Sequence, residues 1–500
     1  MGWFWQSVPS RAWRSLRATL SMCSPTSRRD PLSRHAPSLI GPLWAQAKAS
    51  DPCHGGHARG KRLATAVLAT ALGAAVLLHI PAANAATDID FFFPVPVQGK
   101  LAVEMQKLVQ QFDKSHPDIN VTAVYTGSYD DTNLKTRAAI QAGHPPGVAL
   151  MSANFVRDYY INHNAIPLDA LIAKDGKTPE QFMAQFWPAL KPNAMEAGHV
   201  YGVPFQNSTP LLYYSVDAFK DAGLDPDHPP VTWDDWIADL KTLTKRSGDQ
   251  TTRWGLMFPG TYDYCGWITS ALAMSNGGDY YDTNYGGEVY YNTPTTIGAV
   301  KLLDAMVNQW HVTPPGVTDA NTVTTAFFQG RTAMMILSTG SLSFVRQNMK
   351  TPYKVAFLPR RIVNAAPIGG GSLLIPSGNS PERQAAAWTL INWLVSPEIA
   401  AHWSQFTGYF APRIAAYDLP EMKTYMADHP NARVALDQLN VAGRGWFDTY
   451  DTVAVRKALE DGVQAILAGK TTPEKAMALA QQQADALLKP YVDQTVLKLP

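Results

Sequence analysis

Residues 204–215 read PFQNSTPLLYYS, and the interpretation of the chain depends on this stretch. Four polar residues, Gln206 to Thr209, separate Phe205 from an apolar and aromatic run. Such an interruption has three explanations: a nucleophile at Ser208, a ligand contact or a turn. The patterns on either side of the stretch decide between them.

Strand and helix patterns alternate before this stretch. Residues 88–93 and 120–125 are rich in strand-forming side chains, and between them apolar residues recur at helical spacing, namely Leu101, Met105, Leu108 and Phe112. This alternation predicts an α/β fold. Caps of Ser or Thr followed by Pro and Glu predict three later helices, beginning at Ser380-Pro381-Glu382, Ser396-Pro397-Glu398 and Thr472-Pro473-Glu474.

The composition favours a large globular protein without a nucleic-acid partner. The chain has 500 residues, of which 46% are hydrophobic and 17% charged. Residues 1–85 carry ten of the 42 basic residues and two of the 41 acidic ones, so the remainder has 32 bases and 39 acids, a net charge near −7. A net negative body disfavours nucleic-acid binding. About 415 residues are too many for one simple sheet, so we expect two α/β lobes.

Residues 59–85, RGKRLATAVLATALGAAVLLHIPAANA, predict a signal peptide with cleavage near Ala86. A membrane anchor is the alternative, but the apolar stretch is short and diluted by Ala, Thr and His79. The preceding 58 residues are explained by a start codon assigned too far upstream, so 1–85 is interpreted as a non-mature leader. Cys23 and Cys53 fall in this leader, and the mature chain keeps Cys265, which excludes a disulfide framework and a cysteine-rich metal site.

Motifs of the common catalytic classes are missing from the sequence. No serine stands in G-x-S-x-G, since Ser208 has Gln206 and Pro210 at the glycine positions. There is also no H-E-x-x-H, P-loop or G-x-G-x-x-G motif after a strand. We therefore expect a protein that is not an enzyme. A glycosidase remains an alternative, because its carboxylate pair leaves no short signature.

Three further stretches are candidates for ligand contacts. In AMMILSTGSLSFVRQ (333–347) a strand ends at Leu337 and a helix begins around 338–341, which suits an anion or an ordinary cap. In PIGGGSLLIPSG (367–378) the glycines allow close approach of backbone to a ligand, or form a tight turn. In GTYDYCGW (260–267) aromatic residues stand in a segment expected to be irregular, where they face a ligand or cluster in the core.

These segments resemble the extracellular solute-binding proteins of ABC importers, the group that includes maltose-binding protein. The glycerol-3-phosphate-binding members look most similar. The resemblance is carried by GSYDDTNL (127–134), VPFQNSTPLLYYSVDAFKDAGLDPDHPPVTWDD (203–235), LSTGSLSFVR (337–346), PIGGGSLLIP (367–376) and FTGYFAPR (406–413). It implies a monomeric periplasmic binding protein fold of class II, without catalysis, cofactor or metal. Two α/β lobes would enclose a ligand cleft, with residues 86–205 and 370–410 in one lobe and 206–369 and 411–490 in the other.

The resemblance also implies a set of ligand-binding residues. Matched position by position, they are Tyr129, Asn154, Ser208, Tyr264, Trp267, Ser338, Gly370, Tyr409 and Arg456. Arg456 would form a bidentate pair with phosphate oxygens. The chain departs from the family at two positions. Asn154 stands where family members have an acidic residue that holds glycerol hydroxyls, and Tyr264 stands where they have a tryptophan. The second change would open room for a larger alcohol group beyond the phosphate.

The expected function is capture of sn-glycerol-3-phosphate, or of a glycerophosphodiester such as glycerophosphocholine, in the periplasm. The ligand would be delivered to ABC permease subunits driven by a cytoplasmic ATPase. The alternative is a binding protein for a sugar or sugar alcohol, in which Arg456 has no role. A secreted phosphodiesterase or glycosidase is the alternative from a different class.

Overall fold

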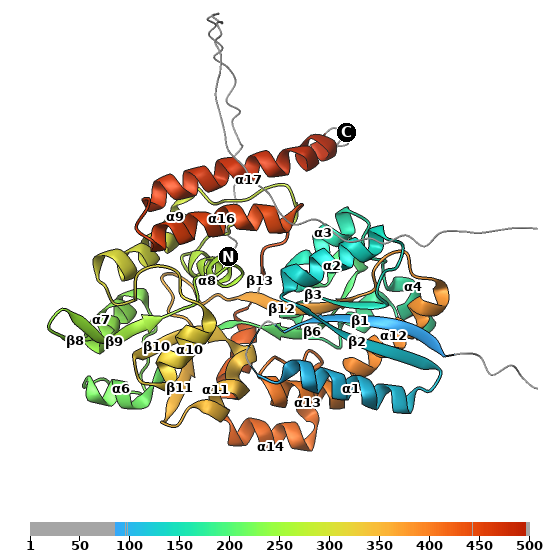
Figure 1. Ribbon diagram of the computed structural model, residues 1–500, viewed down its shortest axis with the longest axis horizontal. Helices are drawn as coiled ribbons and strands as arrows, with labels where there is room; N and C mark the ends of the chain where they lie inside the picture. The colour runs from blue at the N-terminus through green and yellow to red at the C-terminus, as the bar shows by residue number, and fades with distance from the viewer. Residues whose placement is uncertain (1–85, 96, 98, 443, 497–500) are drawn as a thin grey trace, which may run out of the picture. The chain divides into compact units, whose positions relative to one another are not determined.

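The computed structural model describes residues 86–95, 97, 99–442 and 444–496. The expected signal peptide, Cys23 and Cys53 lie outside the described residues. Within this part the strands form two large sheets and a two-stranded ribbon of β4 (Met195–Glu196) and β5 (His199–Val200). Helices cover both large sheets (Figure 1). None of the described helices is both long and apolar enough to cross a membrane.

The first sheet has six strands in the order β13-β12-β3-β1-β2, with β6 paired to β12. β1 is parallel to β2 and β3, whereas β12 is antiparallel to β3 and β6. The strand bounds are β1 (Thr87–Pro94), β2 (Ile119–Gly127), β3 (Val148–Ser152), β6 (Gly202–Ser208), β12 (Pro367–Leu374) and β13 (Arg444–Gly445). The two strands predicted at 88–93 and 120–125 are confirmed as β1 and β2.

Helices pack against the first sheet through the apolar residues that the sequence pattern indicates. In α1 (Leu101–Ser115), which contacts β2, the four periodic apolar residues are all buried. The starts predicted at Pro381 and Pro397 are confirmed, and the Ser380 side chain accepts a hydrogen bond from the Arg383 N–H. The other bounds are α2 (Tyr129–Gln141), α3 (Val156–Ile161), α4 (Asp169–Lys174), α5 (Pro179–Met183), α12 (Pro381–Leu394) and α13 (Pro397–Thr407).

The second sheet has five strands in the order β11-β7-β10-β9-β8. Its two central strands are buried on both faces: Leu212 and Tyr214 of β7 enter one apolar core, while Leu211 and Tyr213 enter another. This alternation follows from the two-residue period of a strand. The bounds are β7 (Pro210–Ser215), β8 (Lys245–Ser247), β9 (Gln250–Met257), β10 (Thr332–Ser338) and β11 (Tyr353–Ala356).

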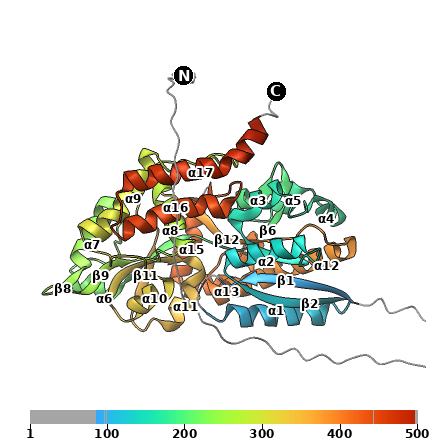
Figure 2. The same ribbon diagram turned by 45° about the horizontal axis from the view of Figure 1, so that its top comes forward.

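The last two helices of the chain lie side by side above this half of the molecule (Figures 1 and 2). They are α16 (Thr452–Leu467) and α17 (Pro473–Val496), and the latter begins at the predicted proline. α16 also packs on α8 (Tyr264–Ser275), which contacts both β7 and β12. The remaining helices are α6 (Val216–Asp221), α7 (Trp233–Leu243), α9 (Pro294–Asp304), α10 (Ala320–Phe328), α11 (Leu342–Asn348), α14 (Pro420–Asp428) and α15 (Pro430–Asp437).

A single residue, Thr209, joins β6 of the first sheet to β7 of the second. It is fully buried, and its hydroxyl donates a hydrogen bond of 2.8 Å to Gln438 Oε1. The same glutamine donates through Nε2 to the carbonyl of Pro210 at 3.1 Å. The polar interruption in PFQNSTPLLYYS is therefore the place where the chain passes between sheets. The buried Thr209 hydroxyl is paired there, whereas the side-chain amide of Asn207 has no hydrogen-bond partner among the described residues.

The glycine run lies inside β12, so the tight-turn interpretation is wrong. Gly370 has φ +82°, in the left-handed region that favours glycine. A Cβ atom there would stand 1.9 Å from the carbonyl oxygen of Gln206, whose strand pairs with β12. The close approach made possible by this glycine is thus between two strands.

The segment GTYDYCGW is only partly irregular, contrary to the expectation. Helix α8 already begins at Tyr264, so Tyr264 and Trp267 lie in its first turn. Asp263 precedes the helix with φ +70° and ψ −50°, and its side chain makes no capping hydrogen bond. Asp is a common N-cap residue, but here its side chain does not cap the helix, and the flanking Gly260 and Gly266 make the segment look irregular in the sequence.

Candidate functional site

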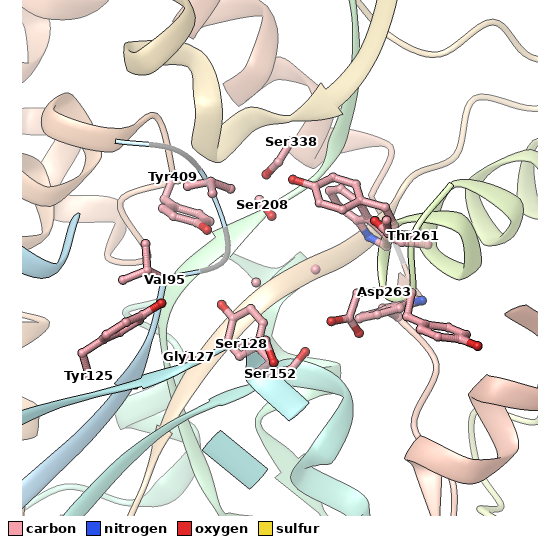
Figure 3. A pocket seen from close by; sticks show the side chains of 18 residues that line it. Val95, Tyr125, Gly127, Ser128, Ser152, Ser208, Thr261, Asp263, Ser338 and Tyr409 are labelled. Atoms are coloured by element: carbon pink, nitrogen blue, oxygen red, sulfur yellow. The ribbon is translucent and has the colours of Figure 1, made fainter. Parts of the chain in front are cut away.

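A cavity of about 290 Å³ lies between the two sheets. The first sheet contributes residues at the carboxyl ends of β2, β3 and β6, and the second contributes the end of β10 and the segment before α8. In Figure 3, Val95 and Tyr125 lie on one side of this space, and Thr261 and Asp263 lie on the other. Carboxyl ends of strands in open α/β sheets are common ligand sites.

Seven of the nine expected ligand-binding residues line this cavity. They come from α2, β6, α8, β10, β12 and the segment after α13, and they are Tyr129, Ser208, Tyr264, Trp267, Ser338, Gly370 and Tyr409. The fold brings them together from positions as far apart as 129 and 409. Ser208 and Ser338 end strands, and Gly370 lies within β12. Tyr264 and Trp267 lie in the first turn of α8. Asn154 and Arg456 are not among the lining residues.

The Tyr129 and Ser338 hydroxyl groups of the cavity have hydrogen-bond partners, whereas Ser152 Oγ has none among the described residues. Tyr129 Oη accepts a hydrogen bond of 2.8 Å from Gln206 Nε2. Ser338 Oγ accepts one of 3.0 Å from the Gly340 N–H, so an ordinary cap is present at this helix start. Burial raises the pKa of Tyr129 and of Tyr409 above the ordinary tyrosine value. Both phenols are therefore neutral at physiological pH and can donate or accept a hydrogen bond.

Two aromatic residues of α8 form part of the cavity wall. The rings of Tyr264 and Trp267 meet edge to face, with centroids 6.2 Å apart. The indole Nε1 donates to the carbonyl of Pro367 at 3.3 Å. A Cβ atom on Gly369 would stand 2.9 Å from the indole, so this glycine makes room for the ring. The glycine run of β12 therefore allows the Trp267 ring of α8 to pack closely against the strand.

Arg456 is enclosed by three carboxylates. Its side chain is 2% exposed, and its nitrogens lie 2.6 Å from Asp130 Oδ2, 2.7 Å from Asp263 Oδ1 and 3.3 Å from Glu460 Oε2. The guanidinium also stands over the Trp446 ring, 5.5 Å from its centroid. Burial alone lowers the pKa of Arg456, but the three carboxylates raise it above its ordinary value. The arginine is permanently charged and already neutralised.

The pKa values of two carboxyl groups in this cluster are raised. Burial raises the pKa of Glu460 to about 8, with Arg456 opposing the shift and Asp263 adding to it. Burial likewise raises the pKa of Asp263, against the attraction of Arg456. Three acids face one base, so the cluster keeps a net negative charge even when Glu460 is protonated.

Asn154 is fully buried, and neither its Oδ1 nor its Nδ2 has a hydrogen-bond partner among the described residues. Two residues earlier, Ser152 at the end of β3 does line the cavity. Sequence reasoning missed Ser152, Asp263 and Trp446, although Asp263 stands beside Tyr264 in a stretch already singled out. Among the described residues no group of three or more His, Cys, Asp or Glu is arranged to hold a metal ion.

Two α/β sheets joined by a buried crossover, with a polar and aromatic cavity between them, are typical of an extracellular binding protein. The chain belongs to the family of bacterial extracellular solute-binding proteins, whose model matches residues 107–431. It is a substrate-binding component of an ABC importer, and its relatives are periplasmic and bind solutes without catalysis.

Particular relatives agree with this assignment. The sn-glycerol-3-phosphate-binding periplasmic protein UgpB of Pectobacterium atrosepticum is 29% identical over 452 residues, which cover 86% of this chain and 98% of the relative. UgpB of Mycobacterium tuberculosis, solved in complex with glycerophosphocholine, superposes with a TM-score of 0.71 at 26% identity, covering 81% of this chain and all of that one. Maltose-bound MalE3 of T. maritima has a TM-score of 0.69 at 23% identity, covering 80% of this chain and 100% of that one, and it shows the shared fold.

Proposed function

We propose that this protein captures sn-glycerol-3-phosphate or a glycerophosphodiester in the cavity between its sheets and delivers it to an ABC permease. The observation that carries the proposal is the convergence of seven residues, expected from the glycerol-3-phosphate-binding proteins, on one cavity. Similarity to UgpB proteins over most of the chain supports it. Export through the segment 59–85 and action as a monomer belong to the same proposal.

We further propose that ligand binding draws two lobes together. One lobe comprises residues 86–205 and 370–410, and the other comprises 206–369 and 411–490. The strand bounds refine the joints, since β6 continues to Ser208 and β12 already begins at Pro367. The ion pair between Asp130 of α2 and Arg456 of α16 spans the two halves. Closure would then be read by the permease as a change of shape.

The surroundings of Arg456 define what phosphate binding requires. Because the Arg456 guanidinium is already paired with three carboxylates, a phosphate can contact it only if Asp130 or Asp263 moves away, or if the arginine pairs with the phosphate and the carboxylate together. This arrangement also supports a second candidate, a neutral sugar or sugar alcohol, for which Arg456 would be a structural residue. The hydroxyl groups and aromatic rings of the cavity suit both ligand types.

Isothermal titration of the purified mature protein with sn-glycerol-3-phosphate, glycerophosphocholine and maltose separates the candidates. We expect heat of binding with at least one of the two phosphates and none with maltose. Tight binding of maltose together with silence towards both phosphates would refute the proposal and support the second candidate. Incubation with glycerophosphocholine should release no free choline, whereas release would reveal a phosphodiesterase.

A further inference from the structure

Asp263 has a strained backbone conformation, and its side chain lines the cavity. Its φ of +70° and ψ of −50° are strained for a residue other than glycine. Its N–H donates a 2.8 Å hydrogen bond to Glu460 Oε1, which holds this conformation. Strain of this kind persists where surrounding contacts enforce it, and such residues gather at functional sites. In Figure 3 the carboxylate of Asp263 extends into the cavity.

The Asp263 side chain is held by its ion pair with Arg456 and not by a capping hydrogen bond. It stands at the N-cap position of α8. Its Oδ1 lies 2.7 Å from Arg456 Nη1, yet neither atom forms a hydrogen bond of good geometry among the described residues. The side chain is 30% exposed and lines the cavity. The exposed part of its carboxylate is therefore available to a bound molecule, while Oδ1 stays against Arg456.

The charge around Asp263 decides which ligands fit. Arg456 supplies one positive charge, whereas Asp130, Asp263 and Glu460 supply up to three negative ones. A phosphate monoester carries nearly two negative charges at neutral pH, and a diester carries one. Like charges in a partly buried site repel strongly. A ligand that adds a positive charge of its own relieves this repulsion.

Aromatic side chains line the same cavity as the Asp263 carboxylate. They are Tyr262, Tyr264, Trp267 and Trp446, and the first two flank Asp263 in the chain. Aromatic faces attract ammonium groups, and a nearby carboxylate adds a full countercharge. Together they provide the chemistry of a site for a cationic head group.

We propose that Asp263 is a specificity-determining residue that receives a cationic head group, so that this protein prefers zwitterionic phosphodiesters to phosphate monoesters and to diesters with an uncharged head. This inference rests on the proposed function, because it presupposes a phosphate ligand in the cavity. Asp263 selects the far end of the ligand, while the hydroxyls near Tyr129 and Ser338 contact the rest.

Titration calorimetry with three ligands tests the proposal. Glycerophosphocholine is the zwitterion, glycerophosphoglycerol has an uncharged head, and sn-glycerol-3-phosphate is the monoester. We expect wild-type protein to bind the zwitterion about tenfold or more tightly than the other two. Asp263→Asn keeps the shape and tolerates a positive φ, and it should reduce that ratio to about one. Asp493→Asn makes the same charge change at an exposed pair with Lys489 and should keep the wild-type ratio.

The outcomes separate the inference from the proposed function. If the phosphates bind but wild type shows no preference for the zwitterion, or if Asp263→Asn keeps the preference, the role of Asp263 is refuted and the proposed function stands. If none of the three ligands binds, both fail. Should Asp263→Asn lack a cooperative thermal transition, Asp263→Gly, which suits the positive φ, is measured in its place with the same expected ratio.

Discussion

Replacement of Gly370 by alanine tests the close contact between β6 and β12. The added Cβ would stand 1.9 Å from the Gln206 carbonyl oxygen and 2.8 Å from the Asn207 Cα, so one strand must move by more than an ångström. We expect about 1 kcal/mol from the positive φ of a residue with a side chain and about 1–3 kcal/mol from the forced overlap. The free energy of unfolding should fall by about 2–4 kcal/mol.

The measurement is urea unfolding followed by fluorescence and circular dichroism, with coincident transitions required of both proteins. Gly143→Ala is the matched control, because Gly143 has φ +77° and an added Cβ meets no atom within 4 Å. It isolates the backbone effect, which should cost about 1 kcal/mol. Equal destabilisation by the two substitutions would refute the steric argument and the strand contact on which it rests.

Two further predictions concern the cluster around Arg456. Arg456→Met should lower the free energy of unfolding by about 3–5 kcal/mol, since the partly buried Asp263 carboxylate loses its countercharge and Glu460 can ionise only at a greater cost. A loss below about 1 kcal/mol in urea unfolding would contradict this. Because burial raises the pKa of Glu460 to about 8, its contribution to stability is present at acid pH and is lost as pH rises through that value. We therefore expect the stability of wild type relative to Glu460→Gln to fall between pH 5 and pH 8, as followed by thermal unfolding. A stability difference that is independent of pH would show that Glu460 does not titrate in this range.

Local patterns in the sequence were sufficient to predict many elements of the fold. The apolar period of α1 and the Ser-Pro-Glu start of α12 each involve neighbours within a few residues, and the structure has both elements at the expected positions. Such signals act through backbone conformation and burial of one face, which the chain encodes locally. Local patterns marked the stretches that hold Ser208, Trp267 and Gly370 as candidates, and the family motifs then picked out the individual cavity residues.

The features that escaped prediction depend on long-range contacts. The start of α8 is held by the Asp263 N–H donating to Glu460, 197 positions away in the chain. Arg456 on an amphipathic helix looks like a surface residue, yet its partner Asp130 is 326 positions away. No local pattern in the sequence predicts that three carboxylates lie around Arg456. The charge balance of the cavity, from which the role of Asp263 is inferred, becomes visible only in the folded protein.

The place of β12 in the first sheet has a consequence for the order of folding. A chain synthesised from its N-terminus contains β1, β2, β3 and β6 long before residues 367–374 exist, yet β6 joins the sheet through β12, and β3 pairs with it as well. Until then both strands present unpaired edges, which invite pairing with other chains. Nascent protein must therefore be kept from aggregating until the chain has grown past Leu374.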